Sequence, residues 1–252
     1  MAAQQQTPPA GDPVNAPGGL DAVARSAGVL PKDLANGGAV IVDAYGKRRV
    51  IDLLSLAIGL LVAFYWGRVI KLVRKTRKET GHSAHFFPPE LVGRLLRIIW
   101  YPTVAAWIIV PLALPFWRDP PEFFRRLYQI PILQALALAG AIVVLILTMI
   151  CWRKMGRDWR MGIDPNEKNN LIVTGPFARV RHPIYALQQL FAILSAIVVP
   201  APIMIMIALL EVLLLSFEAI REERHLVKVH GELYRNYMRQ TGRFIPSLKS
   251  AA

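Results

Sequence analysis

The chain has 252 residues, of which 54% are apolar, and its 30 Lys and Arg against 17 Asp and Glu give a net charge of +13. A soluble nucleic-acid-binding domain of this charge would spread its apolar residues over short periodic runs. Here they form uncharged blocks at 98–117, 130–152 and 183–210, each at least as long as the roughly 20 residues of a bilayer-spanning helix. The sequence therefore predicts an integral membrane protein with no nucleic-acid partner. Its single cysteine, Cys151, excludes an intramolecular disulfide and a cysteine-based zinc site.

Residues 1–46 are rich in Gly and Pro and show little periodicity. Such a composition cannot bury enough apolar surface to offset chain entropy, so we expect a flexible N-terminal tail with at most a short helix at 20–27. No positive residue precedes Arg25 and no apolar stretch resembles the core of a signal peptide. The first apolar helix would then direct the chain to the membrane.

Three hydrophobic helices are predicted at 51–66, extended by Val69 and Ile70, at 98–117 and at 131–152. A fourth apolar stretch, 183–217, would form a helix of about 52 Å, far longer than the roughly 30 Å of hydrocarbon. The Pro200-Ala-Pro202 sequence must therefore be a turn between two helices, at 183–199 and from 203 to about 225.

The predicted fold class is all-α, a polytopic membrane helix bundle of about five transmembrane helices with a C-terminal helical hairpin. We divide the chain into the tail at 1–46, three transmembrane helices at 47–152, and a region at 153–252 that holds the hairpin and a C-terminal tail.

The distribution of basic residues predicts the orientation in the membrane. Eight Lys and Arg lie between the first two helices, seven in 153–181 and seven after residue 217, but only three between the second and third helices. Under the positive-inside rule, the three rich segments are cytoplasmic and the N-terminal tail is outside.

The start of the fourth helix is a candidate anion site. Pro183 suits the first helical position, which places Arg181 and His182 at a helix N-terminus with unpaired N–H groups. Such a terminus favours a carboxylate or phosphate. The alternative is a basic cap that holds lipid headgroups.

The fifth helix carries acidic residues on one side. At 100° per residue, Glu211, Glu218 and Glu222 lie within about 40° of a common line, and Glu223 is about 120° away. Glu211 lies inside the hydrophobic boundary, where a carboxylate by default suggests a functional site. Alternatively, Glu211 is protonated or paired with Gln188 or Gln189 of the preceding helix, and 221–224 is a solvated face of ion pairs.

Residues 171–246 carry a set of short motifs in a fixed order. These are Leu171-Ile-Val-Thr-Gly-Pro-Phe177, Arg181-His-Pro-x-Tyr185, Glu222-Glu223, Gly231-Glu-x-Tyr-x-x-Tyr237 and Arg243-Phe-Ile-Pro246. In order and spacing this segment resembles the isoprenylcysteine carboxyl methyltransferase family and the related membrane phospholipid N-methyltransferases. The helices before it carry no motif beyond hydrophobicity.

The resemblance implies a membrane-embedded methyltransferase that uses S-adenosyl-L-methionine near the cytoplasmic surface, with a lipophilic or lipidated acceptor from the bilayer. It implies that a common set of residues binds the cofactor: Leu171, Ile172, Phe177, Arg181, His182, Pro183, Ile184, Tyr185 and Glu222. Glu218 stands where the prenylcysteine enzymes place a substrate-binding Arg, and Arg221 is close enough to substitute. We therefore expect Arg221 and Glu218 to orient the acceptor, and no metal ion to take part.

Three alternatives remain open at this stage. The first is a phospholipid amine N-methyltransferase of the same superfamily. The second is an NADPH-dependent membrane sterol or enone reductase, although such reductases typically carry Asn where Ile184 stands. The third is a non-catalytic membrane scaffold, which would bind no cofactor. The sequence determines neither the methyl acceptor nor the oligomeric state.

Overall fold

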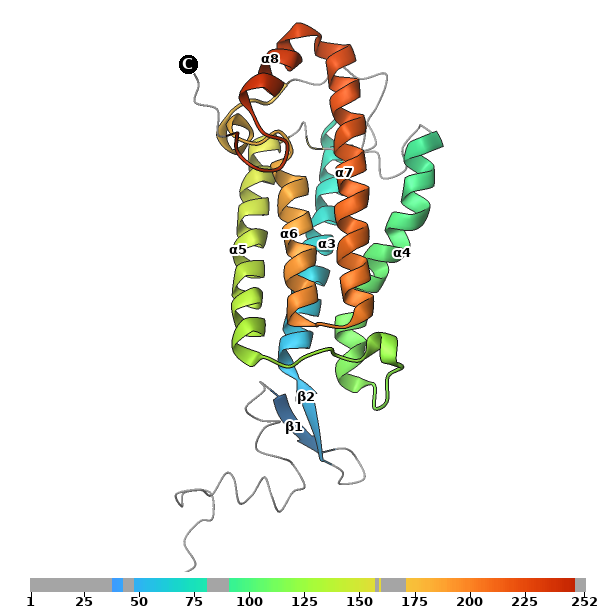
Figure 1. The fold of residues 1–252 in the computed structure, drawn as a ribbon. Coiled ribbons are helices and arrows are strands. Elements are labelled where there is room, and N and C mark those ends of the chain that lie inside the picture. Colours follow the sequence, from blue (N-terminus) through green and yellow to red (C-terminus); the bar gives the residue numbers. More distant parts are fainter. Residues whose placement is uncertain (1–37, 43–47, 81–90, 157–158, 160–170, 248–252) are drawn as a thin grey trace, which may run out of the picture. The chain divides into compact units, whose positions relative to one another are not determined.

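The structure is a computed structural model that describes residues 38–42, 48–80, 91–156, 159 and 171–247 (Figure 1). The chain divides into two compact units, Met1–Leu53 and Leu54–Ala252, and each is described by itself.

In the first unit, β1 (Gly38–Val42) and β2 (Arg48–Asp52) form an antiparallel hairpin with Val40 opposite Val50. Both strands are rich in Val and Ile, whose branched side chains favour extended backbone. The sequence analysis predicted no regular structure at 38–42, so this strand is an addition to the expected fold. The short helix expected at 20–27 lies outside the described residues.

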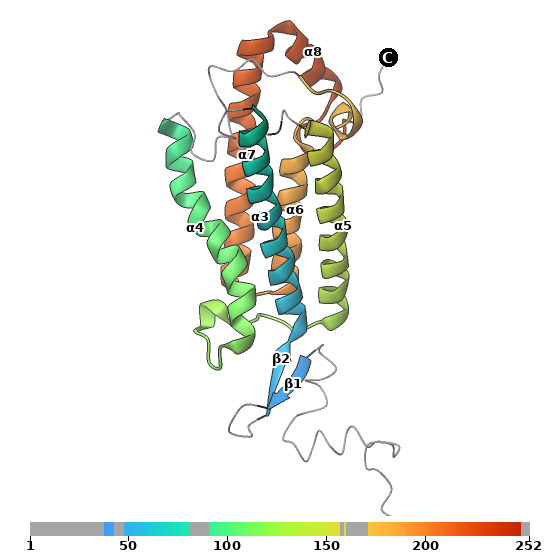
Figure 2. The same cartoon turned by 180° about the vertical axis from the view of Figure 1, so that it is seen from behind.

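The second unit is helical, as predicted. It contains α3 (Leu53–Thr80), α4 (Leu91–Ala113), α5 (Pro131–Met155), α6 (Pro183–Val198), α7 (Pro202–His230) and α8 (Glu232–Gln240). Figures 1 and 2 show α3, α5, α6 and α7 side by side, while α4 diverges from them toward its N-terminal end. The all-α bundle and its C-terminal hairpin are confirmed.

Among the described helices, α3, α4, α5 and α7 are long and apolar enough to cross a membrane. The fifth, α6, has 16 residues and measures about 24 Å, which is shorter than the hydrocarbon layer. Helix α3 continues to Thr80, beyond the predicted apolar segment, and an ion pair between Lys75 and Glu79 (3.7 Å) supports this charged extension.

Large aromatic and aliphatic side chains fill the centre of the bundle. Trp107, Phe191 and Met204 are fully buried, and the rings of Trp107 and Phe191 meet edge to face at 5.3 Å. Other large apolar side chains point outward, including Ile132 at 76% exposure and Leu213 at 65%. A bundle that is apolar both inside and outside is expected for a protein surrounded by lipid.

The α6–α7 turn determines which residues of α6 and α7 lie beside one another. Val199, Pro200 and Ala201 are buried, and the N–H of Leu127 donates to the Pro200 carbonyl at 2.7 Å. The antiparallel helices leave this turn together, so the start of α6 lies about level with residue 217 of α7 and the acidic residues that follow it.

Candidate functional site

The chain just before α6 is paired with the C-terminal segment. Val180 and Gly242 form a parallel bridge, and the N–H of Arg181 donates to the Gly242 carbonyl at 2.8 Å. The N–H of His182 donates to the Arg243 carbonyl at 3.0 Å. A Cβ at Gly242 would lie 1.8 Å from the Ile245 carbonyl oxygen, so this turn requires glycine. The C-terminal segment therefore fixes the start of α6.

Helix α8 adds a second attachment between the same two segments. Gly231, with φ of 57°, ends α7 and lets the chain reverse into α8. The hydroxyl of Tyr237 in α8 then donates to the Phe177 carbonyl at 2.5 Å. Burial raises the pKa of Tyr237 to about 12, so the hydroxyl keeps its proton at neutral pH.

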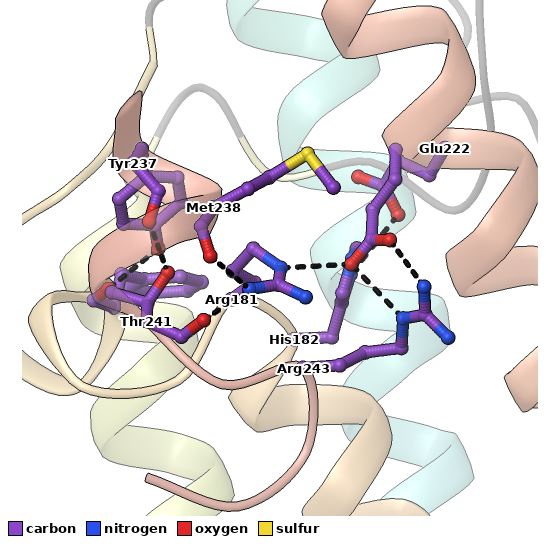
Figure 3. A network of polar contacts seen from close by, with 9 residues as sticks. Arg181, His182, Glu222, Tyr237, Met238, Thr241 and Arg243 are labelled. Atoms are coloured by element: carbon purple, nitrogen blue, oxygen red, sulfur yellow. Dashed lines mark hydrogen bonds and ion pairs between the residues drawn. The ribbon is translucent and has the colours of Figure 1, made fainter. Parts of the chain in front are cut away.

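Glu223 is the ionic centre of this junction. Its side chain is 5% exposed, and its carboxylate accepts hydrogen bonds from Arg181 Nε (2.8 Å), Arg243 Nε (3.1 Å) and Arg243 Nη2 (2.6 Å). The pKa of Arg243 is raised by its hydrogen bond to Glu223. Figure 3 shows the two guanidinium groups converging from opposite sides, and Arg181 also donates to the carbonyls of Met238 (3.0 Å) and Thr241. Glu223 thereby joins α7, the start of α6 and the C-terminal segment.

His182 lies between the two neighbouring glutamates. Its ring stacks on Tyr185 with 5.4 Å between centroids and 4° between planes. Nδ1 lies 3.6 Å from Glu222, and Nε2 lies 3.4 Å from Glu223. Nε2 is buried, and its contact with Glu223 is longer than the hydrogen bonds that the two guanidinium groups make with that carboxylate. Glu222 keeps 35% of its side chain exposed, so it is the acidic residue of the pair that a ligand can reach.

A pocket lies against this junction. The space between its walls, open solvent included, is about 730 Å³. Residues from five helices and from the connection between α5 and α6 line it: Tyr65, Trp66, Val69, Arg97, Trp100, Trp152, Met155, Trp159, Phe177, Arg181, His182, Pro183, Ile184, Tyr185, Gln188, Leu215, Glu218 and Glu222.

The structure brings most of the expected cofactor residues to this pocket. Those that line it are Phe177, Arg181, His182, Pro183, Ile184, Tyr185 and Glu222. Leu171 and Ile172 are half-buried and do not belong to its lining. Of the two residues expected to orient the acceptor, Glu218 lines the pocket, and Arg221 forms an ion pair with it one turn further along α7.

The sequence analysis missed the part of the pocket that the first three apolar helices supply. Tyr65, Trp66, Trp100 and Trp152 form part of the wall, and the Arg97 guanidinium lies 4.4 Å from the Trp100 ring centroid. The signal was present, because each Trp lies within three residues of an Arg at the end of an apolar block. That pattern is typical of membrane interfaces, and only the packing shows that these rings share one pocket.

Glu211 has the partners that one sequence interpretation named. Its Oε2 accepts hydrogen bonds from Gln188 Nε2 (3.0 Å) and Trp100 Nε1 (3.3 Å). The Gln188 Oε1 in turn accepts from the Tyr65 hydroxyl at 3.0 Å. Glu211 is fully buried, and its pairing with Gln188 is therefore confirmed.

A smaller hollow lies between α4 and α7, beside the main pocket. It is lined by Gly93, Leu96, Arg97, Trp100, Leu214, Leu215 and Glu218. Arg97, Trp100, Leu215 and Glu218 line both spaces, so these four side chains lie between the hollow and the main pocket.

Comparison with known proteins agrees with the motifs. No match was found among curated proteins. The model of the isoprenylcysteine carboxyl methyltransferase family matches residues 135–228, which run from α5 through most of α7 and include His182, Glu222 and Glu223. The match ends before the Gly231–Pro246 motifs. The resemblance noted in the sequence at 171–246 is thus confirmed for 171–228, and the similarity to the isoprenylcysteine carboxyl methyltransferase family extends back to residue 135.

Proposed function

We propose that the protein is an integral membrane methyltransferase that uses S-adenosyl-L-methionine and acts on a lipophilic acceptor, with isoprenylcysteine carboxyl O-methylation as the leading reaction. One observation carries the proposal: Phe177 before α6, His182 and Tyr185 at its start and Glu222 in α7, all within the family-matched segment 135–228, line one pocket.

The residues at the start of α6 fit the polar groups of this cofactor. The N–H groups of Ile184 and Tyr185 lie in the first helical turn, where no intrahelical acceptor exists, and the preceding His182 makes no side-chain cap. A carboxylate bound there would also benefit from the helix dipole. The partly exposed carboxylate of Glu222 can accept from ribose hydroxyls or an ammonium group.

The other side of the pocket suits a lipophilic acceptor. The hollow between α4 and α7 lies beside the pocket, and Trp100 and Leu215 line both, so we assign the entry of the acceptor to this side. When bound, S-adenosyl-L-methionine supplies a methyl group on a sulfonium centre. The transfer is an in-line displacement that depends on positioning and on exclusion of water. We assign the positioning of the acceptor's polar end to Glu218 and its ion-pair partner Arg221.

An amine acceptor is the second candidate. A carboxylate acceptor reacts without a base, whereas an ammonium acceptor must first lose a proton. Glu218 and Glu222 both line the pocket and could take that proton, and the surrounding aromatic rings favour a cation. We further propose that the pocket and the C-terminus face the cytoplasm, because the basic segments that surround them follow the positive-inside rule.

Cofactor binding is the first test. Calorimetry on the purified protein should show micromolar binding of S-adenosylhomocysteine, and His182→Ala and Glu222→Ala should abolish it. The exposed Arg239 lies outside the pocket, so Arg239→Ala is the control that should bind like the wild type. Unchanged binding in both pocket variants would reject the site.

Methyl transfer is the second test. The protein is incubated with labelled S-adenosyl-L-methionine and either N-acetyl-S-farnesylcysteine or dioleoylphosphatidylethanolamine in mixed micelles. Base-labile label in the prenylcysteine identifies a carboxyl ester, and base-stable label in the phospholipid identifies N-methylation. The absence of label from both acceptors would refute the proposed function, and NADPH oxidation on addition of an enone would then support the reductase alternative.

A further inference from the structure

The buried carboxyl group of Glu211 has no role in the proposed cofactor site, although three side chains of the pocket depend on it. It is fully buried in the part of α7 that crosses the bundle. Two of its neighbours, Trp100 on α4 and Gln188 on α6, donate hydrogen bonds to its Oε2, at 3.3 Å and 3.0 Å. Both neighbours line the pocket.

The hydrogen bonds continue from Gln188 to a third helix. Gln188 Oε1 accepts from the Tyr65 hydroxyl of α3 at 3.0 Å, and Tyr65 also lines the pocket. A carboxylate accepts hydrogen bonds only, so it orients the Gln188 amide with its NH₂ group toward α7 and its oxygen toward Tyr65. One acidic residue therefore sets the orientation of polar groups on three other helices.

Trp100 links Glu211 to the acceptor side of the pocket. Its indole N–H is fixed by Glu211, its ring meets Trp66 edge to face at 5.2 Å, and Arg97 lies over it at 4.4 Å. Trp100 and Arg97 line both the main pocket and the hollow between α4 and α7. Without the Glu211 carboxylate as its hydrogen-bond acceptor, the indole N–H would be unpaired in an apolar interior. Rotation of the ring toward another polar partner would then lower the free energy. Such a rotation would change the wall between the hollow and the main pocket, on the side to which the acceptor is assigned.

We infer that Glu211 is a positioning residue that holds Trp100 and Gln188 in the orientation that receives the acceptor. The inference rests on the proposed methyltransferase function and adds a residue to its acceptor side. Glu211 does not itself line the pocket, so its effect passes through Trp100 and Gln188. In the described part of the chain, Glu211 accepts hydrogen bonds from Trp100 and Gln188 and not from the cofactor residues at the start of α6.

The test compares two buried polar residues that are both replaced by Leu. Gln134 of α5 is 2% exposed, and its Nε2 donates to the Val198 carbonyl at the end of α6 at 2.7 Å. It lies outside the pocket lining. Glu211→Leu removes two buried interhelical hydrogen bonds and Gln134→Leu removes one, but only the first change affects residues that line the pocket.

Steady-state methyl transfer is measured with whichever probe the wild type labels, N-acetyl-S-farnesylcysteine or dioleoylphosphatidylethanolamine, together with calorimetric binding of S-adenosylhomocysteine. We expect Glu211→Leu to raise the acceptor KM at least tenfold while the Kd for S-adenosylhomocysteine stays within twofold. Glu211→Gln, whose amide oxygen can still accept, should remain within threefold of the wild-type KM, and Gln134→Leu within twofold.

The results distinguish failure of the inference about Glu211 from failure of the proposed function. An acceptor KM for Glu211→Leu equal to that of Gln134→Leu overturns the inference, as does a parallel loss of S-adenosylhomocysteine binding. If Glu211→Leu does not fold, Glu211→Asp is measured in its place, because it keeps the charge and withdraws the acceptor by one methylene; a KM within twofold of wild type then overturns the inference. A wild-type protein that labels neither probe refutes the proposed function itself.

Discussion

Substitutions of Glu222 and Glu223, which are adjacent in α7, should affect different properties of the protein. Glu223 holds Arg181 and Arg243 and is almost fully buried, whereas Glu222 is partly exposed at the pocket. Replacing Glu223 by Ala would leave the Arg181 guanidinium, 10% exposed, without its carboxylate. Removing one member of a buried ion pair costs about 3–5 kcal/mol. Because the Arg243 side chain is 37% exposed, its share is reduced by solvent, and we take the lower value.

A loss of about 3 kcal/mol in the docking of the C-terminal segment corresponds to a roughly 150-fold larger open population. The most direct measurement is hydrogen exchange of the amides of Arg181 and His182, which donate to the carbonyls of Gly242 and Arg243. We expect Glu223→Ala to accelerate their exchange by about two orders of magnitude.

Glu222→Ala is the matched control for this prediction. It removes a carboxylate from the same helix one residue earlier, and we expect exchange within about threefold of the wild type but no binding of S-adenosylhomocysteine. If the amides of Glu223→Ala exchange at the wild-type rate, the ion pairs do not hold the C-terminal segment, and the structural role given to Glu223 is wrong.

Further predictions concern the C-terminal attachment and the orientation. Gly242→Ala should lower both the thermal stability and the cofactor affinity, because its Cβ would lie 1.8 Å from a carbonyl oxygen; a thermal shift assay showing no loss would contradict this. Tyr237→Phe removes one buried hydrogen bond and should cost about 1 kcal/mol, visible as faster proteolysis of α8, and an unchanged cleavage rate would argue against that attachment. For the orientation, Asp119→Cys should react with an impermeant thiol reagent only from outside the cell and Arg239→Cys only from the cytoplasm, since Cys151 is buried and gives little background; the reverse pattern would invert the proposed topology.

The sequence predicted the structure correctly where the geometry of a single helix allowed only one arrangement. The length of the apolar stretch at 183–217 required a turn at Pro200-Ala-Pro202, and the structure has α6 and α7 on either side of it. The 100° rotation per residue separated Glu223 from the line through Glu211 and Glu222, and the two neighbours do face different surroundings.

Contacts between segments that are distant in the sequence could not be predicted from the geometry of single helices. Nothing local to Trp100 distinguishes a residue at the membrane interface from a pocket wall, because the difference depends on how α4 packs against α7. The same holds for Arg181, whose helix-terminal position suggested anion binding, because its guanidinium is engaged by Glu223 and by the carbonyls of Met238 in α8 and Thr241 just after it. The charged end of α3 was also missed, since hydropathy marks where lipid contact ends and not where a helix ends.

The shortness of α6 bears on how two very different reactants could meet. Helix α7 has 29 residues against 16 in α6, and the two leave the same turn, so α7 continues about 20 Å past the point where α6 begins. The pocket at the start of α6 therefore lies well short of the end of α7, next to the residues that pair with the C-terminal segment. In the proposed reaction, a water-soluble methyl donor would enter this pocket from the aqueous side, and a lipid-anchored acceptor would cross only part of the bilayer's thickness to reach it.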